Sequence, residues 1–546
     1  MSQVSPIEPL LPQSAEDLQA AFAAAGATRM QRIRTVEAAL NSPAGPALRR
    51  AAGKWIVDHL TIEKLVPEKY ARWRVLVQDA MQFTVWTLSS ARLAPKLVDQ
   101  WELPANTPTE RRLLRLISKV PGLQKLGQVL ARNRHLLPAL RRALSELENG
   151  IRDMDIAGVH KIIADELGTR LRHNQVKLRP KMFSEASVSA VVRFTWWNPQ
   201  TGRRERGVFK VLKPYIPECF SEDMELLGKL ARHLGLRHRA YGFAPRVLPD
   251  TFRDVRELLQ HEVEFAREQA TLEEARQLYR GVPGVRVPRV IGQLCTPHVT
   301  ALSEERGKKI TQAARRLPLW RRLRISEQLI ELFLAVPIFA AQDRALFHAD
   351  PHAGNLLYDN KTGQLVILDW ALTERVTREQ RRHMGILFAM AALRDPVGIR
   401  REIEALSRSR RKLGVRQAKV IRQCVQRFIE KLPFTRLPRA AETTDLLEDI
   451  AFKGVRLPRA LVMLRKVLFT LDGIQHDLGA GEVGIASAMS RQALQTWFSR
   501  WGSLGAPLTW RDWLSLEWST LFLGSRLCWQ AMSPVRPRMP HAVHRA

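Results

Sequence analysis

Apolar residues recur at helical spacing through the first part of the chain. From Ser14 to Trp101 the periodicity is broken in places and is typical of several helices, the first of them capped by Ser14. After a loop at Pro104–Pro108, a long helical stretch is expected at Glu110–Glu148 and a further helix at Asp155–Leu167. The pattern therefore predicts a helical start to the protein.

At Phe183 the pattern becomes typical of β-strands. The runs ASVSAVVRFTWW and RRERGVFKVL flank the turn NPQTG, and this arrangement predicts a β-hairpin. Helices are expected at Glu222–His233 and, longer, at Arg256–Tyr279, with two short strands at Pro288–Val290 and Val299–Ser303. A small strand-rich region with one long helix therefore follows the helical start.

Helical spacing returns after Leu319 and continues to Gln342. A segment of loops and strands, FHADPHAGNLLYDNKTGQLVILDWA, interrupts it, and helices resume from Arg378 to about Leu478. A strand-rich lobe followed by a helical lobe that holds one polar loop predicts an α+β, protein-kinase-like two-lobe fold.

These changes in pattern divide the chain into five expected segments. Residues 1–104 form a helical extension, and 105–182 form a second helical segment. The two kinase-like lobes are expected at 183–310 and 311–480, and a Trp- and Arg-rich amphipathic tail at 481–546.

Charge and cysteine content narrow the classes of partner and compartment. The 86 Lys and Arg residues against 54 Asp and Glu residues leave a net charge of +32, which favours polyanions: anionic lipid head groups, nucleic acid or nucleotide phosphates. The four cysteines are far apart, which excludes a disulfide scaffold and suits a reducing compartment. We read no secretory signal and no apolar run of the roughly 18 residues that a spanning helix needs, so the chain is not expected to cross a membrane, and a position on a membrane surface stays open.

The polar loop carries the residues with candidate chemistry. His348-Ala-Asp350-Pro-His-Ala-Gly-Asn355 precedes Asp369, which ends an apolar strand, and this is the spacing of a kinase catalytic Asp, a metal-binding Asn and a metal-binding Asp. Mg²⁺ prefers hard oxygen ligands, which Asn355 and Asp369 supply, while Asp350 orients or deprotonates the attacking hydroxyl. The alternative is a loop that uses Asp and Asn only for turns and caps.

Kinases also need a strand lysine paired with a helical glutamate. Lys210 lies in the apolar run GVFKVL, and Glu268, on the helix EVEFAREQATLEEARQLY, can pair with it and position it on the α- and β-phosphates. An edge-strand lysine that points to solvent is the alternative for Lys210, and it is the interpretation we adopt for Lys213.

These motifs resemble those of the UbiB/AarF family of atypical kinase-like proteins, which is linked to ubiquinone and other isoprenoid-quinone biosynthesis. The similarity covers about residues 105–475 and rests on HADPHAGN, ILDWA, VFKV and the family-specific K-x-G-Q motif, here Lys125-Leu-Gly-Gln128. The E-x-D motif of the long helix reads Glu262-Val-Glu264.

The resemblance implies further roles. The K-x-G-Q helices, with Lys125 and Gln128, are expected to fold across the active site, and Glu262 and Glu264 to regulate it. An Ala-rich loop with Ala186 and Ser187 would cover the phosphates. Separately, Glu304 follows a hinge-like strand and is placed near the adenine.

Several positions depart from the family pattern. The Ala-rich loop, near AAASIGQVH in relatives, is SEASVSAVV here and lacks the Gln. Trp370 and Ala371 replace the Phe and Gly of DFG, which predicts a stiffer metal loop. In addition, Glu264 replaces an Asp, and Ala353 replaces a Pro. None of these changes removes an expected metal ligand.

Other signals carry less information. His348 and His352 lack a third ligand for zinc, and His348 is better interpreted as a buttress of the catalytic loop. The basic runs are interpreted first as solvated helix faces and second as sites for anionic lipid, since no nucleic-acid motif accompanies them; they are Arg49–Arg50, Arg315–Arg316, Arg321–Arg324 and Arg408–Lys412.

The tail is rich in tryptophan. Six of the fourteen tryptophans lie between Trp497 and Trp529, near helical spacing. Tryptophan favours the membrane–water interface, so the tail is either an in-plane anchor or a helix packed on the helical lobe.

The function expected from sequence is an ATP- and Mg²⁺-dependent kinase-like ATPase or lipid kinase that supports isoprenoid-lipid metabolism. It would act in the cytoplasm, peripherally on the inner membrane, with anionic lipid and quinone-biosynthesis enzymes or lipid intermediates as partners. The alternative is a pseudokinase: a nucleotide-gated scaffold that binds lipids or enzymes without turnover. A nucleic-acid-binding protein rests on charge alone and is not favoured.

Overall fold

A computed structural model describes residues 28–131, 154–407 and 414–479, apart from short gaps at 61, 66–67, 69–70, 105, 187, 243–244, 246, 434–437, 439, 456 and 458. The described residues form two compact units. The first unit contains the chain up to Arg267 together with Val290–Glu304, and the second unit contains Glu268–Arg289 and the chain from Glu305 onward.

The first unit begins with helices, as the apolar periodicity predicts. They are α2 (Arg29–Leu40), α3 (Gly45–His59), α4 (Ile62–Leu65), α5 (Ala71–Thr87), α6 (Ser90–Glu102), α7 (Thr109–Ile117) and α8 (Pro121–Ala131). Buried apolar residues from these helices, among them Val36, Ile56, Val85, Leu97 and Leu116, form one continuous core cluster.

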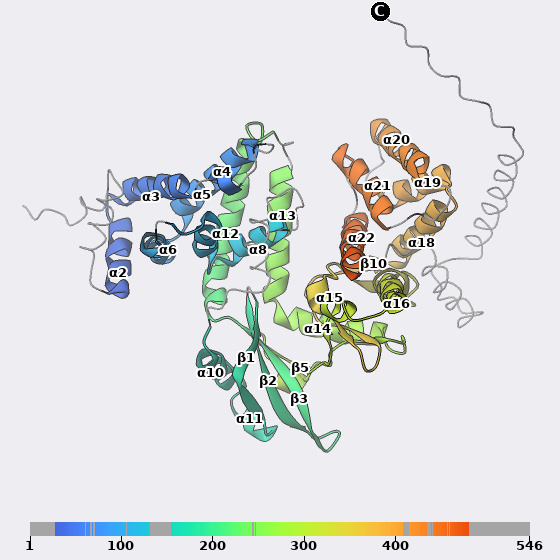
Figure 1. Ribbon diagram of the computed structural model, residues 1–546, viewed down its shortest axis with the longest axis horizontal. Coiled ribbons are helices and arrows are strands. Elements are labelled where there is room, and N and C mark those ends of the chain that lie inside the picture. Colours follow the sequence, from blue (N-terminus) through green and yellow to red (C-terminus); the bar gives the residue numbers. More distant parts are fainter. Residues whose placement is uncertain are drawn as a thin grey trace, which may run out of the picture. The chain divides into compact units, whose positions relative to one another are not determined.

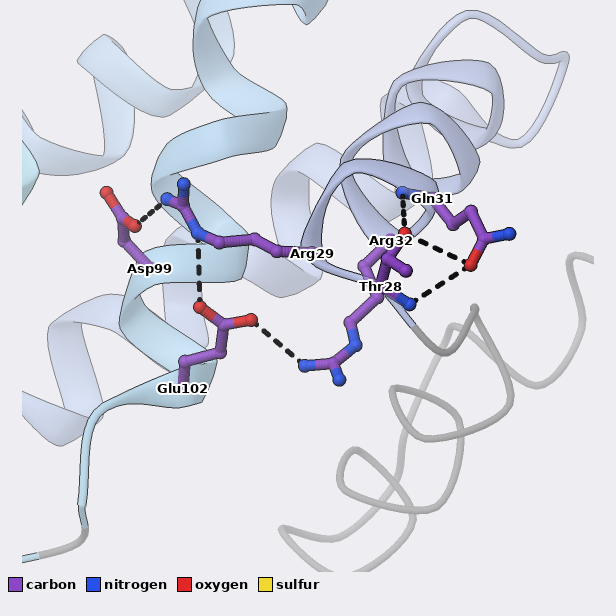
Figure 2. Close-up of polar contacts among 6 residues, drawn as sticks. All are labelled: Thr28, Arg29, Gln31, Arg32, Asp99 and Glu102. Atoms are coloured by element: carbon purple, nitrogen blue, oxygen red, sulfur yellow. Dashed lines mark hydrogen bonds and ion pairs between the residues drawn. The ribbon is translucent and has the colours of Figure 1, made fainter.

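Charged side chains fasten α2 to α6. A capping box at Thr28 begins α2, which places Arg29 and Arg32 in its first turn. Arg29 pairs with Asp99, and a Glu102 oxygen lies 2.9 Å from Arg32 (Figure 2). Exposed pairs of this kind are worth about 0–1 kcal/mol each, so the buried apolar cluster is the main stabilising term here.

A four-stranded antiparallel sheet forms the second part of the first unit. Its strand order is β1 (Lys177–Glu185), β2 (Ser189–Asn198), β3 (Arg203–Leu212), β5 (Val299–Ser303). The predicted hairpin is confirmed, since Ser189 pairs with Leu212 and Asn198 with Arg203, and Gly202 takes the positive φ that the turn requires. Strand β1 was not predicted, because KLRPKMFSE is mostly exposed and has no apolar alternation.

The two faces of this sheet differ. Helix α10 (Ile156–Leu167), the helix expected at Asp155–Leu167, packs on one face together with α11 (Thr169–His173) (Figure 1). Phe209 and Val211 are buried against α10, so Lys210, which lies between them in β3, is directed to the opposite face.

Two long helices of the sequence analysis are interrupted. The stretch expected at Glu110–Glu148 breaks between α7 and α8, where Lys119 has a positive φ, and residues 132–153 lie outside the described part. The helix expected at Arg256–Tyr279 is two helices, α13 (Val247–Val263) and α14 (Phe265–Leu278), separated at Glu264. Neither Gly nor Pro marks the second break, so the sequence pattern could not reveal it.

The second unit contains two small sheets. Strands β7 (Arg344–His348) and β10 (Thr373–Thr377) pair antiparallel. A second sheet has the order β4 (Val285–Arg286), β9 (Gln364–Ile367), β8 (Leu356–Asp359), β6 (Lys308–Lys309). The polar loop of the sequence analysis runs from the end of β7 to β8.

Helices make up the rest of the second unit. They are α15 (Ile310–Ala314), α16 (Leu319–Ile330), α17 (Val336–Ile338), α18 (Arg378–Ala392), α19 (Pro396–Ser407), α20 (Val415–Lys431), α21 (Ala440–Phe452) and α22 (Arg459–Leu478). In the first unit, α12 (Tyr215–Leu236) follows β3.

Among the helices that the structure describes, none combines the length and apolar character needed to cross a bilayer. The Trp-rich tail, residues 480–546, lies outside the described residues.

Candidate functional site

His348 anchors the polar loop. It is buried at the end of β7, and its Nε2 lies 2.6 Å from the backbone oxygen of Asp369, to which it donates. Its Nδ1 accepts a hydrogen bond from the backbone N–H of Asp350 at 3.2 Å. Burial lowers the pKa of His348 to about 4, so the ring is neutral and holds both aspartates in register.

Asp369, Asn355 and His352 form one polar network. The backbone N–H of Ala371 donates to Asp369 Oδ1 at 2.9 Å, and Asn355 Nδ2 donates to Asp369 Oδ2 at 3.1 Å. The same amide nitrogen lies 2.8 Å from His352 Nε2. The loop that carries Asn355 and the segment just after β9, which carries Asp369, therefore bring their side chains together.

The donor set of this network fits Mg²⁺. Asn355 uses its amide nitrogen for the bonds above, so its amide oxygen and the Asp369 carboxylate remain the hard oxygen ligands, and Mg²⁺ commonly takes only one or two side-chain ligands beside phosphate and water. The described residues contain no group of three or more His, Cys, Asp or Glu side chains arranged for a metal ion.

Asp350 has a charged neighbour that the sequence analysis missed. Lys466 Nζ, on α22, lies 3.8 Å from Asp350 Oδ2, and the side chains of Lys466 and Asp350 are 32% and 13% exposed. The contact joins residues 116 positions apart, and no motif around LRKVLF marks it.

The aromatic residue after Asp369 supports the loop from within. Trp370 is fully buried, with its ring centroid 4.9 Å from that of His348 and 5.8 Å from that of Tyr279. The Tyr279 hydroxyl donates to the backbone oxygen of Leu332 at 2.6 Å, and its burial raises the pKa of Tyr279. Glu268, on α14, is also buried.

The nucleotide residues expected near the sheet lie in the first unit. Lys210 Nζ lies 5.1 Å from the centre of the Phe265 ring, and its register partners are Val191 and Thr300. Because Glu268 belongs to the second unit, its pairing with Lys210 stays a prediction.

The other residues expected at the nucleotide occupy separate positions. Glu304 Oε1 lies 2.9 Å from Arg193 Nε, so Glu304 is held by an ion pair at the sheet. The backbone N–H of Ala186 donates to Ser189 O at 2.7 Å. Ser187 lies outside the described residues.

Lys213 differs from its prediction. It is 1% exposed rather than directed to solvent, and its Nζ lies 2.8 Å from Glu185 Oε1. Glu185 ends β1 and is itself 4% exposed at its side chain. The sequence interpretation was wrong because the partner carboxylate comes from a strand that the sequence pattern did not predict.

The K-x-G-Q segment and the E-x-D helix meet. Lys125 on α8 forms an ion pair with Glu262 on α13, 137 positions later, and both side chains are largely buried. The second carboxylate oxygen of Glu262 is buried without a hydrogen-bond partner among the described residues. Glu264, at the helix break, instead accepts from Gln260 Nε2 at 3.2 Å. Gln128 is on α8, but its side chain lies outside the described part.

Residues 146–402 match the model of the ABC1 atypical kinase-like domain. This region is therefore similar to the ABC1 atypical kinase-like domain, and relatives named UbiB are among the proteins the chain resembles. The kinase-like α+β fold predicted from sequence is thereby confirmed. The matched region contains Lys210, Glu268, Asp350, Asn355 and Asp369, whereas Lys125 and Lys466 lie outside it.

Curated relatives carry kinase names. The probable protein kinase UbiB of Pseudomonas putida is 25% identical over 311 residues, which is 55% of this chain and 55% of that protein. The chloroplastic protein ACTIVITY OF BC1 COMPLEX KINASE 7 of Arabidopsis thaliana is 24% identical over an alignment that covers 66% of this chain and 50% of the Arabidopsis protein. The chain thus spans about half the length of these relatives. A Mycobacterium tuberculosis protein solved in complex with erythromycin aligns with 70% of this chain and 96% of its own, at a TM-score of 0.46 and 18% identity.

One departure from the family pattern has little structural cost. Among the described residues only Lys119, Gln175 and Arg394 have positive φ outside glycine, so Ala371 takes the position of the DFG glycine in ordinary backbone geometry. Its N–H supports Asp369 directly.

Proposed function

We propose that this ABC1 domain is an ATP- and Mg²⁺-dependent atypical kinase, acting as an ATPase or as a kinase of a small molecule or lipid. The observation that carries the proposal is the neutral His348, which bonds the Asp350 backbone through one ring nitrogen and the Asp369 backbone through the other. A loop used only for turns would not need this buried support.

Each residue has a distinct task in the proposal. Asn355 and Asp369 would hold Mg²⁺, which when bound neutralises phosphate charge. Asp350 orients the attacking hydroxyl or water and accepts its proton. Lys210 and Glu268 would position the α- and β-phosphates, and Lys466 adds positive charge beside Asp350.

The setting of the activity is inferred from the relatives and from charge. Relatives named UbiB point to ubiquinone or a related isoprenoid lipid as the pathway supported. A net charge of +32 favours an anionic membrane surface at the cytoplasmic face of the inner membrane. The partners proposed for this activity are quinone-biosynthesis enzymes or lipid intermediates.

The test separates metal binding from turnover. Asp369→Asn is expected to weaken nucleotide binding in the presence of Mg²⁺ and to leave binding without Mg²⁺ unchanged. Asp350→Asn is expected to bind Mg-nucleotide normally and to lose about 10²–10⁴-fold in turnover, the range typical of an acid–base group. Nucleotide affinity with and without Mg²⁺, and phosphate release, are measured for both variants.

A matched control removes a carboxylate outside the loop. The Asp343 side chain, just before β7, is 90% exposed, and Asp343→Asn should behave as wild type. Equal turnover of wild type and Asp350→Asn would overturn the catalytic assignment. Normal Mg-nucleotide binding by Asp369→Asn would overturn the metal site.

A pseudokinase is the second candidate. The observation that favours it is the altered nucleotide loop, in which the family's Gln is lost and Glu185 is tied to Lys213. This candidate requires nucleotide binding without turnover in the wild type, and vesicle or enzyme binding that changes when nucleotide is added.

A further inference from the structure

The first unit contains a basic pocket far in sequence from the catalytic loop. It has a volume of about 360 Å³, within the range of small-molecule sites, and opens between residues of α3, α5 and α12. Helix α5 packs against both α3 and α12 (Figure 1). The lining side chains used below are Arg49, Arg50, Phe83, Trp86, His233 and Arg237.

Arg49 brings an uncompensated charge to this pocket. Its Nη1 donates to the backbone oxygens of Val85 at 3.0 Å and Leu88 at 2.7 Å, and its Nη2 donates to Ser90 Oγ at 2.9 Å, so it caps the C-terminal end of α5. None of these partners is a carboxylate, and burial lowers the pKa of Arg49. A half-buried cation held by dipoles alone is stabilised by a nearby anion.

The remaining charges leave the pocket positive. Arg237 is matched by Asp79 at 2.8 Å, and that carboxylate also accepts the hydroxyl of Tyr241. Asp79 is the one acidic side chain among the lining residues. Arg50 is exposed at the rim, so an anion in the pocket meets at least two arginines that Asp79 does not neutralise.

Aromatic side chains give the pocket an apolar edge. Trp86 is 54% exposed, although a tryptophan of a folded helix is usually covered. Phe83 stacks on His233 with ring centroids 4.4 Å apart. Tryptophan beside arginine is the combination that favours the head-group level of a membrane.

We propose that this pocket binds the phosphate head group of an anionic phospholipid at a membrane surface. Arg49 and Arg50 contact the phosphate, and Trp86 lies against the glycerol and the first acyl carbons. The proposal deepens the membrane setting proposed above and rests on it, and the residues assigned to the lipid, Arg49, Arg50 and Trp86, lie before the matched ABC1 region. A soluble phosphate ester shares this chemistry and is distinguished by experiment.

The experiment uses the full chain and two variants that spare the helix cap. Arg50→Gln and Trp86→Ser alter exposed side chains, whereas Arg49 is left in place because it caps α5. Co-sedimentation is measured with vesicles of phosphatidylcholine alone and with added phosphatidylglycerol. Arg50→Gln should weaken binding to the anionic vesicles about fivefold, the factor for one cation near an anionic surface, and the double variant more.

Matched controls distinguish a pocket from general charge. Arg34→Gln removes an exposed arginine of α2, and Trp197→Ser removes a 40% exposed tryptophan of β2. Both should bind vesicles more tightly than the pocket variants. If the pocket variants and the controls bind alike, the pocket does not hold the head group and the proposal falls.

Two further measurements complete the test. Glycerol 3-phosphate that binds this site as tightly as the vesicles do would overturn the lipid assignment in favour of a free phosphate ester; weak competition supports the lipid. Nucleotide affinity should be unchanged in Arg50→Gln and Trp86→Ser. A wild type that binds vesicles through the pocket but binds no nucleotide would overturn the kinase proposal and leave this one standing.

Discussion

Lys213 and Glu185 form a buried ion pair, with Nζ and Oε1 2.8 Å apart and side-chain exposures of 1% and 4%. The pair joins Glu185, which ends β1 and belongs to the expected nucleotide loop, to the residue after β3. The backbone N–H of Lys213 also donates to Val188 O at 2.9 Å. The carboxylate of Glu185 therefore fastens this loop to the sheet.

Breaking this pair from one side should destabilise the first unit. Glu185→Ala removes the carboxylate of a buried ion pair, which typically costs about 3–5 kcal/mol in the free energy of unfolding. The double variant Glu185→Ala, Lys213→Met removes both charges and should recover most of that loss. Urea unfolding measures the effect.

An exposed ion pair provides the control. Glu225 and Lys229 lie 2.7 Å apart on α12 with exposures of 63% and 42%, so Glu225→Ala should cost less than about 1 kcal/mol. Equal losses in Glu185→Ala and Glu225→Ala would contradict the burial argument.

Lys96 predicts a rise in stability with pH. Burial lowers the pKa of Lys96 to about 7, with Arg92 as a further cause, although Asp99 and Asp223 act in the opposite direction. Between this value and an unfolded pKa of about 10.4, the unfolded chain binds more protons than the folded one, so each pH unit above 7 adds up to about 1.4 kcal/mol to the free energy of unfolding.

The measurement compares unfolding at about pH 7 and about pH 9, below the range in which tyrosines ionise. Lys96→Met cannot titrate at this position, so the free energy of unfolding of the wild type minus that of the variant should increase as the pH rises. A difference that is independent of pH would show that Lys96 remains charged in the folded protein.

The sequence predicted what depends on local pattern. Alternation around NPQTG defines the hairpin that holds Lys210, and the spacing of HADPHAGN and Asp369 defines residues that the structure brings within 3.1 Å. It could not predict contacts that arise only by packing. The burial of Lys213 depends on β1, and the place of Lys466 beside Asp350 depends on how α22 packs. The break at Glu264 has no local signal.

Lys125 should influence nucleotide handling from outside the ABC1 region. It is paired with Glu262 on α13, and α14, the helix of Glu268, begins directly after the break at Glu264. Lys125→Ala leaves the Glu262 carboxylate, one oxygen of which already lacks a hydrogen bond, buried without its cation. We expect altered nucleotide affinity, turnover or Mg²⁺ dependence.

The charge-swapped double variant Lys125→Glu, Glu262→Lys is the control for this pair. It retains one cation and one carboxylate and should restore part of the wild-type behaviour. If Lys125→Ala leaves affinity, turnover and Mg²⁺ dependence all unaltered, the K-x-G-Q segment has no regulatory role in this chain.

Lys466 is expected to assist the reaction without binding the nucleotide tightly. Its ammonium group lies 3.8 Å from Asp350 Oδ2. A phosphoryl group that is transferred to an acceptor held by Asp350 therefore passes close to this positive charge, which stabilises its negative oxygens. Removing a preorganised group that stabilises such charge commonly lowers turnover by about 10²–10³-fold. Lys466→Gln should show a loss of this order in phosphate release, with nucleotide affinity changed little, and Lys466→Arg should recover part of the rate because it keeps the charge.

Arg465, the preceding residue of α22, is the matched control, since Arg465→Gln removes the same charge from the same helix. It should retain nearly full turnover, because no ion pair places its charge beside Asp350 among the contacts described for this helix. If Lys466→Gln and Arg465→Gln lose turnover equally, net charge alone explains the effect. In that case the position of Lys466 beside Asp350 gives it no advantage over Arg465. The 3.8 Å contact is then an ordinary ion pair without a role in the reaction.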